Sequence, residues 1–429
     1  MITSTIGKIF LTAYNQKYKQ HFDARTFFDE VYYPLFFDSN KYMQWVQNSP
    51  FVQMKKGQKV DNLSSEDRLE KLQNLHDKIS SGTNDASVAI GYAASEEKEF
   101  ATTSGQITDI PISISKDEVY LSWIGSSLGV GLQGGLSILF PHANILLDIF
   151  EGWSLYRQLL VNNDQLKGNQ IGTWNGQWLA HRYSSKFDTQ HAMANFDPFE
   201  TKGDIINIKT QSWTKILLGI SLKYTFNQMT GYVYNLGQTN TTVGFIPFIL
   251  PEIKRPADLY KKMFGLSHAR EAEQLWGTEF GFRTCCQSGA IGVKAMAPKG
   301  VQKLIKEATL PKIKKNNKKL ELTFNTYLIW ILAMLNNEKL WDLSMEFAQT
   351  LHDYIRQDEK KLSKLKTNQV DNVLKSTNKK NFIDSLVDIA KDTSDKESIS
   401  SIAKEVNLMP TDNVPYFLTL IRFNYASLI

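Results

Sequence analysis

The chain has 429 residues, of which 42% are hydrophobic, with a net charge of +5 and a mean hydropathy of −0.31. This length and composition are typical of a soluble protein of two or three domains, and they exclude a largely membrane-embedded or disordered chain. The only cysteines, Cys285 and Cys286, are adjacent. They therefore provide neither a disulfide framework nor the ligand spacing of a structural zinc site, which favours the reducing cytoplasm.

Charge is distributed unevenly along the chain. Residues 294–429 carry 22 Lys and Arg against 16 Asp and Glu, whereas the preceding residues are close to neutral. A positive excess confined to one region indicates an acidic partner, of which nucleic acid is the most common.

Residues 1–118 mix helical and extended patterns. Apolar residues at every fourth position from Ile2 to Tyr18 predict a helix capped by Thr3 or Ser4. A short helix is expected from Asp23 to a point before Pro34, because the residue before proline disfavours the helical conformation. A helix beginning at Ser64–Asp67 and ended by Gly82 would bury Leu69, Leu72, Leu75 and Ile79. Strands are expected at 86–91 and 107–114.

The stretch from Val119 to Tyr183 concentrates glycines, amides and tryptophans. We expect a strand at Val119–Trp123, a glycine-rich segment at 125–135, a second strand ending at Phe140 and a helix at Asn144–Leu160. Gly129–Gly134 matches the dinucleotide pattern G-x-G-x-x-G, with Glu151 near the spacing of a ribose-binding acid.

The dinucleotide motif requires a strand running directly into the glycines and a helix leaving them. The segment after Gly135 is instead typical of a strand. A buried, glycine-containing hairpin is therefore favoured over a nucleotide site. It is also favoured over a membrane span at Leu121–Phe140, which glycine, serine and Gln133 make too polar.

The remaining chain changes character near Lys294. Before it, the sequence predicts strands at 205–208, 232–236 and 241–250, and helices at 213–224, 256–264 and 268–276. After it, apolar stripes predict helices only. These stripes are Leu320–Leu335 and Leu340–Tyr354, then Ile399–Val406 behind a capping box at Ser394–Glu397, and finally Phe417–Ile421. We therefore expect an α+β protein with a mixed α/β domain at 1–293 and an all-α helical bundle at 294–429.

The chain contains no recognisable catalytic motif. None of its seven histidines has metal-ligand spacing, and neither a nucleophile elbow nor a Walker loop is present. His181 is expected to bond locally or to pack. Asp148 and Glu151 form a carboxylate pair on one helix face, for which a solvated helix start is the favoured interpretation. We expect no enzyme activity, no metal and no cofactor.

Two groups of residues are candidate nucleic-acid contacts. Side chains that can read base edges, stack on bases or hold phosphates are Lys167, Asn169, Gln170, Trp174, Asn175, Gln177 and Arg182, together with the polar loop residues Thr103, Ser104 and Gln106. A loop that satisfies its own backbone is the alternative. Candidate phosphate contacts, or else a solvated helix face, are Lys299, Lys312, Lys314, Lys315, Lys318 and Lys319.

Several segments resemble the large subunit of a type I CRISPR interference complex (Cascade). They are Phe27–Tyr42 with its Tyr-Tyr-Pro-Leu-Phe-Phe-Asp core, Ala101–Gln106, Leu121–Gly135, Asp148–Trp153 and Lys167–Tyr183, and they cover the N-terminal two-thirds unevenly. The resemblance implies a mixed N-terminal domain that reads a short duplex motif beside the target, the PAM, and holds the 5′ end of the CRISPR RNA (crRNA). A C-terminal helical bundle would support the separated strands.

From this resemblance we expect a non-catalytic, DNA- and RNA-binding protein of antiviral defence in the cytoplasm. It would recognise the PAM, help to open target double-stranded DNA and stabilise the R-loop. Its partners would be crRNA, the backbone and small subunits, and a helicase-nuclease recruited in trans. The alternatives are a nucleotide-dependent enzyme using Gly129–Gly134 and a plain interaction scaffold. We also expect the bundle to fold when expressed from Met296, a candidate internal start for a small subunit.

Overall fold

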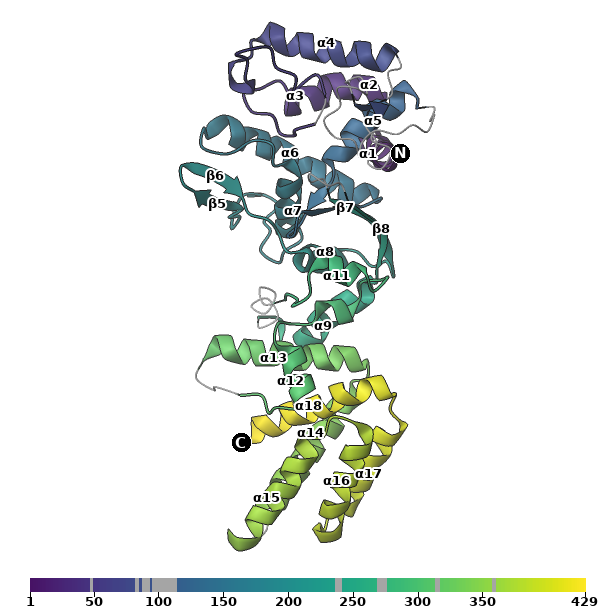
Figure 1. The fold of residues 1–429 in the computed structure, drawn as a ribbon, viewed down its shortest axis with the longest axis vertical. Helices are drawn as coiled ribbons and strands as arrows, with labels where there is room; N and C mark the ends of the chain where they lie inside the picture. The colour runs from purple at the N-terminus through teal and green to yellow at the C-terminus, as the bar shows by residue number, and fades with distance from the viewer. Residues whose placement is uncertain are drawn as a thin grey trace. The chain divides into compact units, whose positions relative to one another are not determined.

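The computed structural model describes residues 1–46, 49–81, 85–86, 93–94, 114–235, 241–267, 276–312, 317–356 and 360–429. They form two compact units. Figure 1 colours the chain by residue number. The first contains Met1–Tyr224 and Gln228–Phe248 and combines helices with small sheets. The second contains Thr225–Asn227 and Ile249–Ile429, and its described residues form helices. The expected α+β class is confirmed.

The second unit begins at Ile249, whereas we expected the helical domain to begin at Lys294. The reason is that α9 (Leu250–Phe264) packs against α13 (Lys318–Leu335) and therefore belongs with the later helices. Residues 249–293 thus supply part of the second core.

The first helix packs with its backbone directly on a later helix. α1 (Ile2–Tyr18) lies against α5 (Lys116–Ser127), and a Cβ atom at Gly7 would overlap the carbonyl oxygen of Leu121. Only glycine permits this approach. The helix starts without a side-chain cap, so capping by Thr3 or Ser4 was a wrong prediction. Thr3 is instead buried, with its hydroxyl oxygen 2.7 Å from that of Ser122.

α5 lies where we expected a strand at Val119–Trp123, so that prediction is wrong. Ser115 and Glu118 form a capping box: the Ser115 hydroxyl accepts the Glu118 N–H at 3.2 Å, and the Glu118 carboxylate accepts the Ser115 N–H at 2.9 Å. Every residue from Val119 to Ser127 is buried. A helix buried on all sides has no polar face, and its sequence therefore lacks the helical period.

The helix that begins after Asp23 does not end before Pro34. Asp23 caps α2 (Ala24–Phe27) by accepting the Thr26 N–H at 2.7 Å. The chain then widens into one π-helical turn, η1 (Phe28–Tyr32), and continues as α3 (Tyr33–Phe36). Proline has no N–H to donate and clashes with the carbonyl group one turn back, and a π-helical turn relieves both conflicts.

α4 (Ser65–Ser81) starts where the sequence predicted, with Ser64 and Asp67 each accepting the other's backbone N–H. Leu75 and Ile79 are buried as expected, but Leu69 is 58% exposed, and Lys71 and His76 occupy the buried face. After α4, β1 (Asp85–Ala86) pairs with β2 (Ala93–Ala94). Residues 107–113, where we expected a strand, and the loop Thr103–Gln106 lie outside the described residues.

The glycine-rich segment forms the expected hairpin. β3 (Val130–Gly131) and β4 (Leu136–Leu139) are antiparallel and belong to a sheet of order β3-β4-β7-β8, in which β7 is Met229–Asn235 and β8 is Thr241–Phe248. A helix precedes the glycines and a strand follows them, so they lack the geometry of a dinucleotide motif. In the described part of the chain, no helix has the length and apolarity needed to cross a membrane.

Two cations tie the helices of the first unit together. Arg157 on α6 (Ala143–Asn162) donates to the carbonyl oxygens of Leu35 at 2.6 Å and Lys41 at 2.8 Å, near the end of α3. The Lys41 ammonium in turn donates to the carbonyl oxygens of Asn163 and Asp164, both at 2.8 Å, beyond the end of α6. Arg157 therefore satisfies a carbonyl group in the last turn of α3, and Lys41 binds the chain just beyond the end of α6.

The helix at Asn144–Leu160 is confirmed by α6, and two further helices pack next to it in turn. α7 (Ile171–Arg182) packs on α6, and α8 (Trp213–Lys223) packs on α7 (Figure 1). The remaining strands of the first unit are β5 (Phe199–Lys202) and β6 (Ile205–Ile208), which pair with each other.

The second unit confirms most of the predicted apolar stripes. α14 (Lys339–Arg356) buries Leu340, Phe347, Leu351 and Tyr354, and α18 (Val414–Leu428) packs on both α13 and α14. In α13, Leu320 is 42% exposed, so the predicted stripe begins too early. The shorter elements before α13 are α11 (Phe282–Cys286), η5 (Val293–Met296) and α12 (Val301–Glu307).

Three helices extend this bundle: α15 (Lys360–Leu374), α16 (Lys379–Asp392) and α17 (Lys396–Leu408) pack successively on one another (Figure 1). α17 is capped by Asp395, which accepts the Ser398 N–H at 3.1 Å, and not by the predicted Ser394–Glu397 box. The buried residues Ile399, Ile402 and Val406 are as expected.

Candidate nucleic-acid-binding surfaces

Asn175, one of the predicted base-reading amides, is a core residue. Its side chain is fully buried, and its amide nitrogen donates to the carbonyl oxygens of Ser127 at 2.8 Å and Gly129 at 2.9 Å. Its amide oxygen accepts the indole N–H of Trp153 at 3.2 Å. Since these bonds join α5, β3, α6 and α7, Asn175 holds the fold together and has no polar atom available for a base.

Trp174 and Gln177 are also turned inward. The indole N–H of Trp174 donates to the carbonyl oxygen of Gly152 at 2.8 Å, and the ring is fully buried. The Gln177 amide donates to the carbonyl oxygen of Lys209 at 2.7 Å and is 8% exposed. We therefore interpret Trp174, Asn175 and Gln177 as residues that stabilise the fold, and no longer as candidates for reading bases.

The loop from Lys167 to Gln170 remains on the surface. Lys167 and Asn169 are exposed, and Asn169 has a left-handed backbone with a φ of 61°. Gln170 is half-buried, and its amide oxygen accepts the backbone N–H of Ile208 in β6 at 3.1 Å. Of the candidate base and phosphate contacts between Lys167 and Gln170, Lys167 and Asn169 therefore face solvent.

Arg182 is held by two acids of α6. Its guanidinium lies 2.7 Å from an oxygen of Asp148 and 2.7 Å from one of Glu151. The second oxygen of Asp148 accepts the hydroxyl groups of Tyr183 at 2.7 Å and Tyr224 at 3.2 Å. Asp148 is 9% exposed and lies mid-helix, so the interpretation of a solvated helix start is wrong.

Lys17 completes this network from α1 by pairing with Glu151. Burial lowers the pKa of Lys17, but the hydrogen bond and charge of Glu151 outweigh burial and raise the pKa overall. Burial, followed by the charge of Asp148, raises the pKa of Tyr183, and burial raises the pKa of Tyr224 to about 12. Both tyrosines therefore remain hydrogen-bond donors to Asp148 at neutral pH.

A pocket of about 560 Å³ opens beside this network. It is lined by residues of α1, α6 and α8 together with Tyr224, and its charged side chains are Lys17, Asp148 and Lys223. Asp148 and Lys17 are already paired with other residues. The network therefore acts as a structural clamp between α1, α6 and α7.

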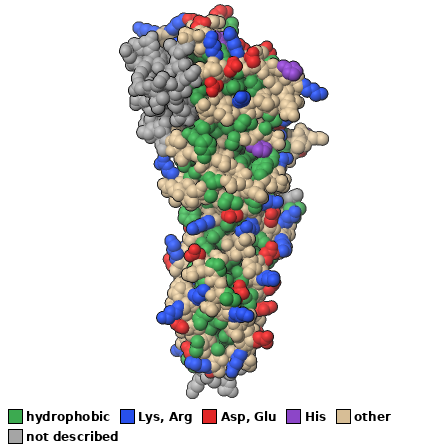
Figure 2. Space-filling model, turned by 90° about the vertical axis from the view of Figure 1, so that its right-hand side faces the viewer, with side chains coloured by type: hydrophobic (Ala, Val, Ile, Leu, Met, Phe, Trp, Pro, Cys, Tyr) green, Lys and Arg blue, Asp and Glu red, His purple; other side chains and the backbone are tan. Residues whose placement is uncertain are grey.

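Residues 294–319, here called the lysine segment, expose all of their described lysines. Lys294, Lys299, Lys303, Lys306, Lys312, Lys318 and Lys319 all face solvent, and Glu307 is the one acid among the described residues of 294–319. Lys314 and Lys315 lie outside the described residues. On the face in Figure 2, Lys and Arg side chains are mixed with Asp and Glu side chains. The lysine segment therefore differs from that face by its scarcity of acids.

The described residues form no metal-binding constellation. No group of three His, Cys, Asp or Glu side chains there is arranged to hold a metal ion. His181 lies 2.8 Å from the carbonyl oxygen of Ala192 and stacks on Phe196, as the local interpretation predicted. Burial raises the pKa of Cys285 to about 11 and of Cys286 to about 12, so neither is a reactive thiolate.

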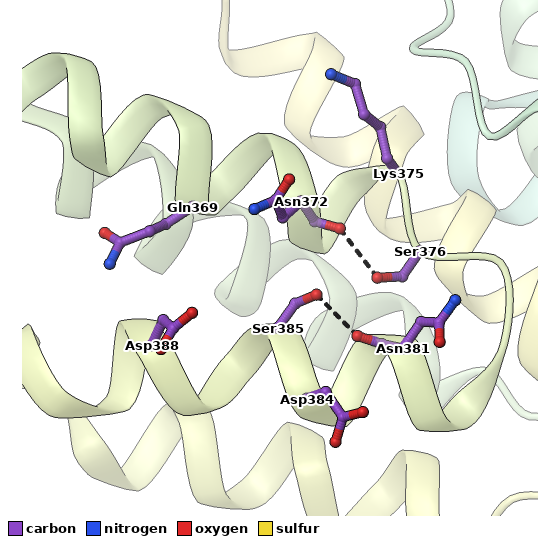
Figure 3. Close-up of a pocket in the computed structure, with 8 residues that line it drawn as sticks. All are labelled: Gln369, Asn372, Lys375, Ser376, Asn381, Asp384, Ser385 and Asp388. Carbon is purple, nitrogen blue, oxygen red and sulfur yellow. Dashed lines mark hydrogen bonds between the residues drawn. The ribbon is translucent and has the colours of Figure 1, made fainter.

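A polar pocket of about 420 Å³ lies between α15 and α16 (Figure 3). Its Ser376 and Ser385 hydroxyl groups donate to carbonyl oxygens of their own helical segments, those of Asn372 at 3.0 Å and Asn381 at 2.8 Å. Asp388 lies 3.2 Å from Lys391 on the same helix. These local bonds are typical of a hydrated seam between two helices.

Sequence reasoning missed two features. Trp45 is 43% exposed, although most tryptophans of the chain are in the core, and composition gave no sign of which one would be outside. It also missed that Lys17, Tyr183 and Tyr224 surround Asp148. The adjacency of Arg182 and Tyr183 at one helix end was the available signal.

The chain matches no protein-family model, and no curated protein or solved structure is significantly similar to it.

Proposed function

We propose that this chain is the large, non-catalytic subunit of a type I CRISPR interference (Cascade) complex in the cytoplasm. It binds crRNA and the backbone and small subunits, recognises the PAM, helps to open target double-stranded DNA and stabilises the R-loop. RNA–DNA pairing reads the target sequence, and the protein reads the flanking duplex. A helicase-nuclease recruited in trans cuts the DNA.

One observation carries the nucleic-acid part of this proposal. Lys318 and Lys319 occupy the first turn of α13, at the end of a segment whose described lysines are all exposed. A run of exposed lysines with few acids attracts a polyanion such as nucleic acid, and Glu307 is the one acid among the described residues of 294–319. This arrangement supports contact with a phosphate backbone.

The organisation of the chain supports the same proposal. A mixed α/β unit precedes a helical unit, which is the order that the resemblance implies. The first unit exposes Lys167 and Asn169 on one loop, a cation and an amide of the kinds that hold phosphates and read base edges. We assign PAM contact to this loop and DNA backbone contact to the lysine segment.

The backbone assignment is tested by replacing Lys299, Lys312, Lys318 and Lys319 with glutamine in the assembled complex. DNA binding should weaken about equally for all sequences, and the slope of log affinity against log salt should flatten by about 0.9 for each lost phosphate contact. The matched control replaces Lys364, Lys380, Lys396 and Lys404, four exposed lysines of the same unit. Equal effects of both sets, or a sequence-selective defect, would contradict the assignment.

The PAM assignment is tested with Asn169→Ala and Lys167→Ala. If Asn169 reads a base edge, its loss should cost about 1–3 kcal/mol at one PAM base pair and relax the preference there, whereas loss of Lys167 should weaken all PAM variants alike. Lys186→Ala, an exposed lysine beyond the other end of α7, is the control. Failure of the chain to co-purify with crRNA and the other subunits would refute the whole proposal.

A further inference from the structure

Trp45 is an exposed tryptophan in a chain that buries almost all of its others. All nine tryptophans lie in the described residues, and only Trp45 is among the exposed large apolar side chains, at 43%. Trp123, Trp153, Trp174 and Trp330 are fully buried by comparison. Both neighbours of Trp45 are turned away from solvent: Val46 is buried, and the Gln44 amide donates to the Ser126 hydroxyl at 3.2 Å.

The backbone before Trp45 is joined directly to the loop that bears Lys167 and Asn169. The carbonyl oxygen of Tyr42 accepts the N–H of Asn169 at 2.7 Å, and that of Met43 accepts the N–H of Ile171 at 3.2 Å. On its other side the loop bonds to β6, where the N–H of Lys167 donates to the carbonyl oxygen of Ile206 at 2.9 Å. Trp45 therefore projects from a bonded platform of three chain segments.

The exposed side chains of the platform segments are polar, and they include the acid Asp164 as well as amides and a cation. Asn40 and Asn169 are exposed amides, and Lys167 is an exposed cation of the same platform. Lys41 is not available for a ligand, because its ammonium already donates to three carbonyl oxygens. Tryptophans in protein interfaces lie in cores that are depleted of charged residues. An exposed indole ring on a platform that also exposes amides and a lysine instead fits a nucleobase and its phosphate.

We infer that Trp45 and Lys167 form a binding site for an unpaired stretch of nucleic acid, next to the Asn169 contact that is assigned to the PAM duplex. One base stacks on the indole of Trp45, and Lys167 contacts a neighbouring phosphate. Trp45 distinguishes single strands from duplexes, because both faces of a base inside a duplex are already stacked on neighbouring base pairs. The inference rests on the proposed function only for the source of the strand, which is either opened target DNA or guide RNA.

The test uses the full-length chain and two fluorescent probes of about 16 nucleotides, an oligothymidylate and an oligouridylate, with a duplex of equal length as the third arm. Trp45→Ala should weaken single-strand binding by about 5- to 150-fold, the range for loss of one stacked base, and leave duplex binding unchanged. Trp45→Phe keeps a stacking ring and should lose less. A larger loss with one probe than with the other identifies DNA or RNA as the source.

The controls separate stacking from charge and from misfolding. Lys167→Ala should weaken single-strand binding and flatten its salt dependence, whereas Lys186→Ala should do neither. Since Trp45 is partly exposed, Trp45→Ala should keep the melting temperature of the wild type. Unchanged single-strand affinity of a folded Trp45→Ala chain, or equal losses for single strands and duplex, overturns the inference.

The proposed function can fail separately. If the chain binds single strands through Trp45 but does not assemble with crRNA, the Trp45 site is supported and the Cascade proposal is refuted. If the chain assembles and discriminates the PAM but Trp45→Ala does not change single-strand binding, the Cascade proposal is supported and the Trp45 site is refuted.

Discussion

The guanidinium of Arg422 donates to the carbonyl oxygen of Leu374 at 2.6 Å, at the last residue of α15. A second nitrogen donates to the carbonyl oxygen of Ser376 at 2.6 Å, and the side chain is 1% exposed. Burial lowers the pKa of Arg422 to about 10, so it stays charged at neutral pH. A buried cation thus replaces the glycine or water that commonly completes a helix C-terminus.

Replacing Arg422 by methionine should destabilise the second unit. The carbonyl groups of Leu374 and Ser376 would lose their donors while buried, which should cost about 2–4 kcal/mol in the free energy of unfolding. Urea denaturation followed by circular dichroism measures this. Lys391→Met, which removes an exposed pair with Asp388, should cost less than about 1 kcal/mol. Equal costs would show that Arg422 has no capping role.

Acid should destabilise the first unit through its buried histidines. Burial lowers the pKa of His76, His142 and His181 below the ordinary 6.5, and for His76 this outweighs the opposing charge of Asp29. The unfolded chain therefore takes up protons first as pH falls. Stability is fully present above about pH 6.5 and is lost below it, by at most about 1.4 kcal/mol per pH unit for each histidine.

The measurement is the urea midpoint between pH 7.5 and 5.5, with hydrogen exchange to locate the loss. His76→Gln cannot titrate, so its stability should depend less steeply on pH in this range. A pH dependence identical to that of the wild type would exclude His76 as a contributor.

Asp148→Asn should destabilise the first unit by about 2–4 kcal/mol. The substitution keeps the shape but leaves Arg182, whose side chain is 23% exposed, with Glu151 alone. It also places an amide NH2 group among donors that the buried carboxylate accepted. Glu151→Gln is the comparison: its side chain is 27% exposed, and its loss should cost less than about 1 kcal/mol. Thermal unfolding of both variants measures the difference, and a reversed order would contradict the clamp.

A fragment from Ile249 to Ile429 should fold, and one from Met296 should be much less stable. Starting at Met296 removes α9, whose Arg255 donates to the carbonyl oxygen of Ala333 at 3.1 Å. It also removes the carbonyl oxygen of Val293, which accepts the indole N–H of the fully buried Trp330 at 2.9 Å. Thermal melting of the two fragments measures this: the fragment from Ile249 should melt cooperatively, and the fragment from Met296 should melt at a much lower temperature or without a cooperative transition.

A stable fragment from Met296 would support the internal start suggested by the sequence. Intact-mass analysis of the purified complex tests that start directly, since a chain initiated there would appear as a separate species that Met296→Leu abolishes.

Helices with one apolar face could be predicted from the sequence. In α14 the spacing of Leu340, Phe347, Leu351 and Tyr354 reports the buried side, because the opposite side is polar. α5 could not be predicted this way, since its residues from Val119 to Ser127 are all buried. The boundary of the second unit also could not be predicted from the local sequence pattern, because it depends on which helix α9 contacts.

The candidate site was harder to predict than the fold. Residue type shows what Asn175 can bond to, but not that its partners are the backbone of Ser127 and Gly129. The neighbouring Asn169 has the same side chain and is exposed. Which of two such amides faces solvent follows from tertiary packing, as does the exposure of Trp45.

The backbone contact between Gly7 and Leu121 sets an order of events during synthesis. The two contacting residues are separated by more than a hundred residues, so α1 leaves the ribosome long before α5 is synthesised. At about 5–20 residues per second, the interval is on the order of ten seconds. Throughout it, the face of α1 around Gly7 has no partner in α5. A nascent chain paused before Lys116 would therefore offer this helix to chaperones, and the first unit can close only after Ser127 has emerged.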